Sequence, residues 1–156
     1  MITTLSFEFK NILSAGRLIG FDLGTKTLGI AISDTTRMIA SPHSLIIKDK
    51  QAITFEKITK IMTELSAVAC VMGLPMNLDG SEGPRCQAVR QFATDFQKLY
   101  GFPFLLWDER FSSNIVDKLM IQADMSRKKR AQNIDKMAAT YILQGALDAC
   151  RSIMNS

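Results

Sequence analysis

The sequence predicts an α/β protein with a mixed five-stranded sheet and helices on both faces. Three observations support this fold class. Short apolar segments separated by tight turns occupy the first third of the chain, which is typical of an antiparallel meander. Apolar residues at helical spacing begin after residue 50, and from there expected helices and strands alternate. The 156 residues are enough for one domain with a sizeable core.

The expected meander consists of strands at residues 17–21, 27–33 and 44–47. In the second strand the bulky apolar side chains alternate with small ones, so one face carries only Gly29, Ala31 and Ser33. A face of small side chains favours a helix packed closely against it. The sequence before residue 16 shows no periodicity, and we expect residues 1–15 to be a loosely attached extension of a single domain at 16–156.

The rest of the chain alternates between helices and strands. Helices are expected at residues 51–66, 84–100 and 134–153, with a shorter one from Ser112 or Ser113 to about 122. Strands are expected at residues 68–72 and 103–107, and a polar connector at 124–130. Three antiparallel strands followed by such units give the element order of a ribonuclease-H-like fold.

The composition excludes several classes of function. Three cysteines without CxxC spacing disfavour a disulfide framework or a zinc site, and a lone histidine disfavours triad chemistry. No apolar run is long enough to span a membrane, and the N-terminus lacks the order of a signal peptide, so we expect a cytoplasmic protein without a membrane partner. The net charge of +4 is compatible with a nucleic-acid partner without requiring one.

Acidic residues at separate places in the chain are the main candidates for chemistry. Asp22 follows the first apolar strand, Asp34 the second, and Asp108 and Glu109 the last one, while Asp135 begins the final helix. Carboxylates without histidine suit Mg²⁺ or Mn²⁺, and two such ions can activate water and stabilise the leaving oxygen at a phosphodiester. The residues therefore favour a metal-dependent nuclease, in which carboxylates from distant segments converge at one sheet edge.

For Asp135 two interpretations stay open. The residues three, four and seven positions later are Ala138, Ala139 and Ile142, which predicts that this acid faces the sheet. Alternatively, it is a helix-start acid favoured by the helix dipole.

Several residues could bind the phosphates of a nucleic acid. Lys26 lies just after Asp22, Arg110 follows the acidic pair, and Asn77 belongs to the turn-rich segment NLDGSEG. A run of four cations precedes the last acid: Arg127, Lys128, Lys129 and Arg130. Each also has a structural interpretation, as a solvated turn lysine, an ion-pair partner, an ordinary turn or a solvated connector.

Four segments together resemble one family in order and spacing. They are GFDLGTKTLGIAISD, VMGLPMNLDGSEGPR, WDERFSS and NIDKMAATYILQGAL, and they cover about residues 16–147. The chain is similar to the YqgF family, whose members are also called RuvX-type Holliday junction resolvases or pre-16S rRNA nucleases. The resemblance implies a ribonuclease-H-like, cytoplasmic, metal-dependent nuclease. It implies that Asp22, Glu109 and Asp135 are the catalytic metal ligands, with Asp108 in reserve, and that Mg²⁺ or Mn²⁺ is the cofactor.

The resemblance leaves the substrate open. We favour processing of the 5′ end of pre-16S rRNA in ribosome biogenesis, with Holliday junction resolution as the alternative, and expect a monomer or weak homodimer. The partner would be structured RNA, branched DNA or the ribosome precursor. A third hypothesis is a non-catalytic nucleic-acid-binding module for ribosome assembly. The segment DLGTKTLG also resembles the phosphate loop of actin-like and sugar-kinase ATPases, but those enzymes need a second domain to close over ATP.

Overall fold

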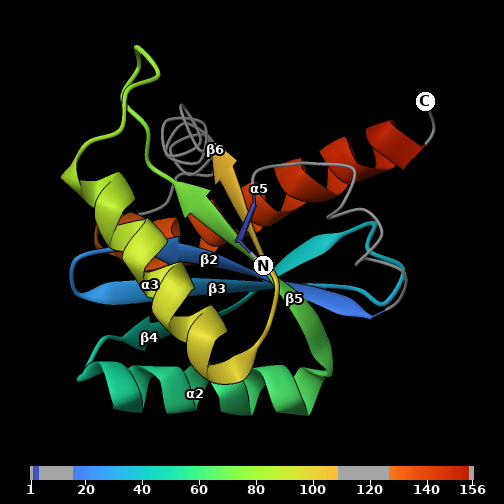
Figure 1. The fold of residues 1–156 in the computed structure, drawn as a ribbon, viewed down its shortest axis with the longest axis horizontal. Coiled ribbons are helices and arrows are strands. Elements are labelled where there is room, and N and C mark those ends of the chain that lie inside the picture. The colour runs from blue at the N-terminus through green and yellow to red at the C-terminus, as the bar shows by residue number, and fades with distance from the viewer. Residues whose placement is uncertain (1, 4–15, 109–126, 155–156) are drawn as a thin grey trace.

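The structure is a computed structural model that describes the backbone of residues 2–3, 16–108 and 127–154 and the side chains of 16–108 and 137–151. A six-stranded sheet forms its centre, with the strand order β1-β6-β5-β2-β3-β4 (Figure 1). The strands are β1 (Ile2–Thr3), β2 (Arg17–Leu23), β3 (Thr27–Ser33), β4 (Ala40–Ile47), β5 (Ala67–Leu74) and β6 (Phe104–Asp108). The helices are α2 (Gln51–Leu65), α3 (Pro84–Tyr100) and α5 (Arg127–Met154).

The five predicted strands are present, and from residue 16 onward the predicted order of strands and helices is confirmed where the structure describes the chain. β1 is a sixth strand that the sequence did not predict. β3 and α3 have the expected bounds, whereas β4 begins at Ala40, four residues earlier than expected. Pro42 interrupts the apolar pattern in β4, but proline is tolerated in an edge strand, and among the described residues β4 is the last strand of the sheet, paired with β3. The helix expected after Ser112 lies outside the described residues. Within those residues, no helix is long and apolar enough to cross a bilayer.

Two features of the chain's organisation differ from the expected pattern. Within the segment 1–15, the described residues Ile2 and Thr3 pair in parallel with Phe104 and Leu105 at the edge of the sheet. A two-residue strand is too short to show periodicity in the sequence. The final helix begins at Arg127, so the four-cation run is helical and does not belong to a polar connector. Lysine and arginine are good helix formers, which explains the continuation.

Strand direction determines which segments meet at each edge. β2 pairs with β3 in antiparallel fashion and with β5 in parallel, and β5 pairs with β6 in parallel. The carboxyl ends of β2, β5 and β6 therefore lie at one edge of the sheet, which we call the β2-end edge. The carboxyl end of β3 lies at the opposite edge, which we call the β3-end edge.

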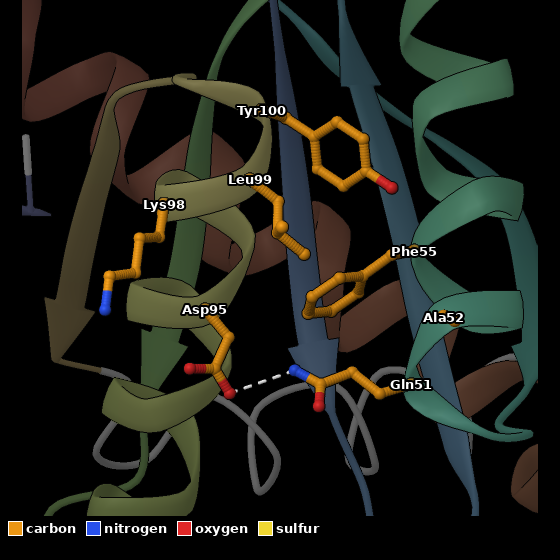
Figure 2. A pocket seen from close by; sticks show the side chains of 7 residues that line it. All are labelled: Gln51, Ala52, Phe55, Asp95, Lys98, Leu99 and Tyr100. Atoms are coloured by element: carbon orange, nitrogen blue, oxygen red, sulfur yellow. Dashed lines mark hydrogen bonds between the residues drawn. The ribbon is translucent and has the colours of Figure 1, made fainter.

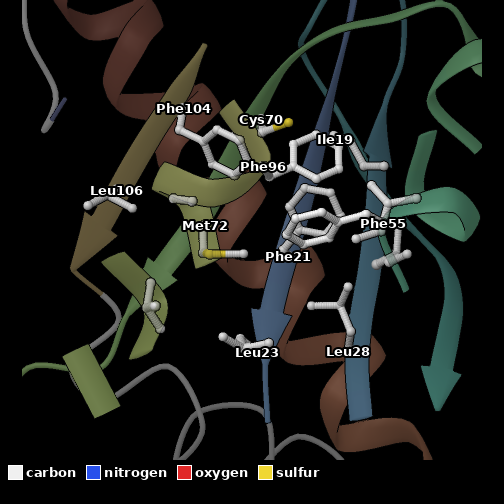
Figure 3. Packing of buried hydrophobic residues seen from close by; sticks show 14 of the residues in the cluster. Ile19, Phe21, Leu23, Leu28, Phe55, Cys70, Met72, Phe96, Phe104 and Leu106 are labelled. Atoms are coloured by element: carbon white, nitrogen blue, oxygen red, sulfur yellow. The ribbon is translucent and has the colours of Figure 1, made fainter. Parts of the chain in front are cut away.

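One apolar core lies between the sheet and the helices α2 and α3 (Figures 1 and 3). Ile19, Phe21 and Leu23 of β2 point into it, together with fully buried aromatic side chains. The Phe55 ring of α2 meets the Phe96 ring of α3 edge to face, with centroids 5.0 Å apart. Burial of such side chains stabilises the fold by about 1.5–3 kcal/mol each. This core fixes β2 in the middle of the sheet.

A second core lies on the other face, beneath α5. The small side chains predicted for one face of β3 do face this helix: Ala31 is fully buried among residues of α5. At Gly20 of β2, a Cβ atom would lie 2.7 Å from Cβ of Leu143 and 3.2 Å from the carbonyl oxygen of Ala139. Only glycine permits so close an approach, so Gly20 sets the distance between β2 and α5.

α5 runs from the β2-end edge toward the β3-end edge. Ala139 lies over Gly20, in the middle of β2. Five residues further along the helix, Gln144 accepts a hydrogen bond from the amide of Ala40 and donates one to the carbonyl of Met38. Arg151, near the helix end, also donates to the Met38 carbonyl. The amino-terminal part of α5 therefore lies on the side of Asp22.

Candidate nuclease site

Asp22 lies in β2, one residue before its end, and its side chain is half-buried. It pairs with Gly29 of β3 across the ladder. Because alternate residues of a strand face opposite sides, Asp22 shares a face with Leu18 and Gly20, which lie under α5. The structure therefore presents this carboxylate at the β2-end edge, on the side of the sheet that α5 covers.

A tight turn follows Asp22 and carries the predicted phosphate ligand Lys26. The turn is closed by a hydrogen bond from the amide of Gly24 to the carbonyl of Thr27. Lys26 itself is exposed, and its carbonyl accepts a hydrogen bond from the amide of Lys48. Solvent exposure leaves the Lys26 side chain accessible to a ligand at this edge.

Two further cations flank this turn, and the sequence did not predict a role for either of them. The ammonium group of Lys48 donates to the carbonyls of Gly24 and Thr25, at 3.0 and 3.3 Å. On the other side, Arg85 donates to the carbonyl of Leu23 at 3.4 Å. Both line a small hollow of about 150 Å³ beside the turn. The only signal for Arg85 was its place in the first turn of α3, directly after the GSEGP segment; for Lys48 there was none.

Asp108 is the last residue of β6 and is exposed. Met72 of β5 pairs with Phe21 of β2 on one side and with Leu106 of β6 on the other. The next residues of β2 and β6, Asp22 and Trp107, therefore lie at the same level of the sheet. Trp107 packs into the core under α5. Asp108, the next residue, belongs to the opposite face, so strand alternation puts Asp22 and Asp108 on different sides of the sheet.

The backbone of α5 carries Asp135 and the four cations toward the same edge as Asp22. Position 135 precedes Ala139, which lies over Gly20, by about one helical turn. Ala138, Ala139 and Ile142 are buried against the sheet, as their spacing predicts. Positions 127–130 are one to two turns earlier in the same helix. The side chains of residues 127–136 lie outside the described part of the structure.

The loop between β5 and α3 contains Asn77, another predicted substrate ligand. Its side-chain amide donates to the hydroxyl of Ser81 at 3.0 Å, and its backbone amide donates to the Ser81 carbonyl. Asp79 accepts hydrogen bonds from the amide and hydroxyl of Ser81. The polar residues of this loop thus shape the loop itself. A bidentate salt bridge between Glu82 and Arg90 anchors the end of this loop to α3, and it lowers the pKa of the Glu82 carboxyl.

Asp34 does not join the other acids, contrary to the expectation that strand-end carboxylates converge. β3 is antiparallel to β2, so Asp34 lies at the β3-end edge. Its carboxylate accepts hydrogen bonds from the Thr36 hydroxyl and from the amides of Met38 and Ile39. These bonds, with Thr36 the largest contributor, lower its pKa from 3.8 to about 2. Asp34 organises the β3–β4 loop.

Glu109 and Arg110 lie outside the described residues. Within the part of the chain whose side chains are described, no three histidine, cysteine, aspartate or glutamate side chains gather as a metal site. The cysteines of this part are all buried, and burial raises the pKa of the Cys70 thiol.

A hollow of about 450 Å³ lies elsewhere, between α2 and α3 (Figure 2). Its walls are mostly apolar, with Phe55, Leu99 and Tyr100 prominent. Its carboxylate, Asp95, accepts hydrogen bonds from the side-chain amides of Gln51 and Gln91. A single carboxylate held by two amides is a poor metal site, so this hollow is not the candidate site for phosphodiester chemistry.

Comparison with known proteins gives both a family and a fold. The family model described as "RuvX: Holliday junction resolvase" matches residues 16–149. A Rhodobacter capsulatus protein named "Putative pre-16S rRNA nuclease" is 48% identical over 133 residues, which are 85% of this chain and 84% of the relative. A Sphingopyxis alaskensis protein of the same name is 45% identical and covers 96% of this chain and 98% of its own.

The structural comparison confirms the predicted fold class. The structure of Thermus thermophilus RuvC in complex with a Holliday junction substrate superimposes with a TM-score of 0.56, at 12% identity, over 88% of this chain and 96% of RuvC. The fold is therefore the ribonuclease-H-like fold that the element order predicted.

Proposed function

Since this chain belongs to the family described as RuvX, Holliday junction resolvase, we propose that it is a divalent-metal-dependent nuclease that processes the 5′ end of pre-16S rRNA. The site would lie at the β2-end edge, with Asp22, Glu109 and Asp135 as its carboxylates. The observation that carries the proposal is the half-buried Asp22 at this edge, on the face covered by α5.

The geometry of α5 supports Asp135 as a partner of Asp22. Ala139 of α5 lies over Gly20 of β2. Asp22 is two residues after Gly20, roughly 7 Å further along the strand. Asp135 is four residues before Ala139, roughly 6 Å back along the helix. Both steps lead toward the β2-end edge. The two backbone positions therefore lie at the same end of the α5–β2 contact.

Strand alternation supports Glu109 over Asp108 as the third carboxylate. Asp108 lies on the opposite face of the sheet from Asp22, which disfavours a shared ion. The acid that follows Asp108 in the sequence is Glu109, and the proposal assigns the metal-binding role to it.

The donor chemistry fits Mg²⁺ or Mn²⁺. The candidate ligands are carboxylates, the described cysteines are buried, and His43 is exposed on β4, where its ring bonds to the Ser44 hydroxyl. Hard oxygen donors without imidazole or thiolate favour these ions over zinc. When bound, such ions would activate water and stabilise charge on the phosphodiester oxygens.

The basic residues around Asp22 would hold the nucleic-acid backbone. Lys26 is exposed on the adjacent turn and would contact a phosphate directly. Lys48 and Arg85 hold that turn through its carbonyls and so act as positioning residues. The phosphate-binding surface would be extended by cations next to the other two acids. Arg110 directly follows Glu109, and the cations Arg127, Lys128, Lys129 and Arg130 precede Asp135.

The test compares two substrates of equal length: a structured RNA with a precursor-like 5′ extension and a four-way DNA junction. We expect cleavage of the RNA with Mg²⁺ or Mn²⁺, none with EDTA, and slower cleavage of the junction. Faster cleavage of the junction would favour junction resolution instead. Cleavage of neither, with RNA binding that survives loss of all three acids, would favour a non-catalytic assembly module.

A pair of variants tests the ligand assignment. Glu109→Gln should lower the cleavage rate by at least about 100-fold, because loss of a metal ligand costs more than loss of a group that only supports one. Asp108→Asn should retain activity within about 10-fold. The reverse order would show that Asp108 is the ligand.

A further inference from the structure

A second cavity lies at the β3-end edge, where the β3–β4 loop meets the C-terminal part of α5. Its volume is about 240 Å³, and it is lined by Leu18, Thr36, Arg37, Met38, Leu147, Cys150 and Arg151. Leu18 is four residues before Asp22 in β2, roughly 13 Å along the strand. The cavity is therefore separate from the proposed nuclease site.

Arg37 is held in this cavity wall in an unfavourable state. Its φ of 57° is in the left-handed region, which arginine rarely adopts. Its Nη1 atom is buried and has no hydrogen-bond partner among the described residues. A buried guanidinium nitrogen without an acceptor is costly. Because Asp34 bonds to three groups of the same loop, the loop holds Arg37 in place despite both penalties.

A second cation lines the same cavity. Arg151 donates from Nη1 to the Met38 carbonyl at 3.1 Å, and its other terminal nitrogen pairs with Asp148. Asp148 partly compensates Arg151, whereas Arg37 has no such ion pair in the described structure. Burial raises the pKa of the Cys150 thiol in the same wall, and the positive charge of Arg37 opposes that rise.

The remaining walls are apolar. Leu18 and Leu147 are buried core residues, and Met38 is about half exposed at the cavity's edge. The volume is below the roughly 300–1,000 Å³ of sites for drug-sized ligands, so an occupant must be small. Cationic and apolar walls in one small cavity call for a ligand with an anionic head and a compact apolar body.

We propose that this cavity binds a small organic oxyanion, with its phosphate or carboxylate group against Arg37 and Arg151 and its apolar body against the exposed side chain of Met38. The oxyanion would interact with the positive charge of both guanidinium groups. The site does not depend on the proposed nuclease activity.

Titration calorimetry on the full chain at low ionic strength tests the proposal with four probes: phenyl phosphate, benzoate, inorganic phosphate and neutral benzyl alcohol. We expect one of the two aromatic anions to bind at least about tenfold more tightly than inorganic phosphate or benzyl alcohol. The tighter of the two identifies the head group. Equal or undetectable binding of all four would overturn the proposal.

Arg37→Gly is the decisive variant, because glycine adopts positive φ without strain. We expect it to weaken binding of the preferred anion by at least about tenfold, while the unfolding midpoint of the ligand-free protein stays the same or rises. Lys57→Gln, which removes one exposed positive charge on α2, should bind like wild type. Loss of binding in Lys57→Gln, or a large fall of the ligand-free midpoint in Arg37→Gly, would show non-specific attraction or a structural arginine.

The two sites can also be separated. Asp22→Asn should bind the anionic probes as wild type does, even where it cleaves no substrate. If Asp22→Asn loses probe binding, the probes occupy the β2-end edge and the proposal is wrong.

Discussion

Asp22 and Asp34 both come at the carboxyl end of an apolar strand, yet they lie at opposite edges of one sheet. Asp34 accepts three hydrogen bonds from its own loop, which lower its pKa to about 2. Asp22 lies on the face under α5, opposite Gly29 of β3 and two residues after Gly20, where α5 approaches the strand closely. The difference shows that strand direction decides which of two similar acids can join a site.

The largest expected effect comes from removing the two charges separately. Asp22→Asn should lower the rate of RNA cleavage by at least about 100-fold, because a metal ligand is lost. Asp34→Asn should cleave at close to the wild-type rate, since this acid is remote from the β2-end edge. Both rates are measured at saturating Mg²⁺ or Mn²⁺, with circular dichroism to confirm folding.

Equal losses in the two variants would mean that Asp34 is needed to hold the site together. Equal retention would remove Asp22 from the chemistry and with it the proposed site.

The sequence predicted the fold more completely than the site. Apolar periodicity and glycine or proline boundaries were enough for β3 and α3, because those elements have strong local signals. The expectation for Asp34 was inconsistent with the antiparallel meander predicted for the first strands: in an antiparallel pair the two carboxyl ends lie at opposite edges, as the pairing of β3 with β2 shows. β1 was missed because two residues carry no periodicity.

The contacts around the proposed sites were still harder to predict. Lys48 is 24 residues from Gly24, and Arg151 is 113 residues from Met38, yet each forms a hydrogen bond with that partner. Neither pair has a local sequence signal. Such contacts depend on how α5 packs on the sheet and on how β4 pairs with β3, and the sequence pattern does not contain that information.

A second prediction concerns the close approach that brings α5 to the Asp22 side. Gly20→Ala should destabilise the protein by about 1–3 kcal/mol, because the new methyl group would lie 2.7 Å from Cβ of Leu143 and force α5 away from β2. Gly83→Ala is the matched control: its methyl group would meet Asn77 at 3.7 Å, an ordinary contact. Urea unfolding gives both free energies of unfolding.

For Gly83→Ala we expect a loss below about 1 kcal/mol, since alanine is only a poorer N-cap than glycine. A Gly20→Ala protein as stable as wild type would mean that α5 is not held tightly against β2. The proposed pairing of Asp22 with Asp135 would then lose its geometric support.

The smallest expected effect is the pH dependence that comes from Asp34. Its pKa is about 2 in the folded protein and 3.8 in the reference state, so folding favours the ionised form. The stabilisation is fully present above pH 3.8 and is lost as the pH falls through about 2. Asparagine at this position keeps one acceptor oxygen but carries no charge that titrates. The difference in unfolding free energy between wild type and Asp34→Asn should therefore shrink steadily from pH 5 to pH 2 in urea titrations. A difference that stays constant over this range would mean that the loop hydrogen bonds do not depend on the charge of Asp34. In that case the contrast between the two acids would rest on their positions in the sheet alone.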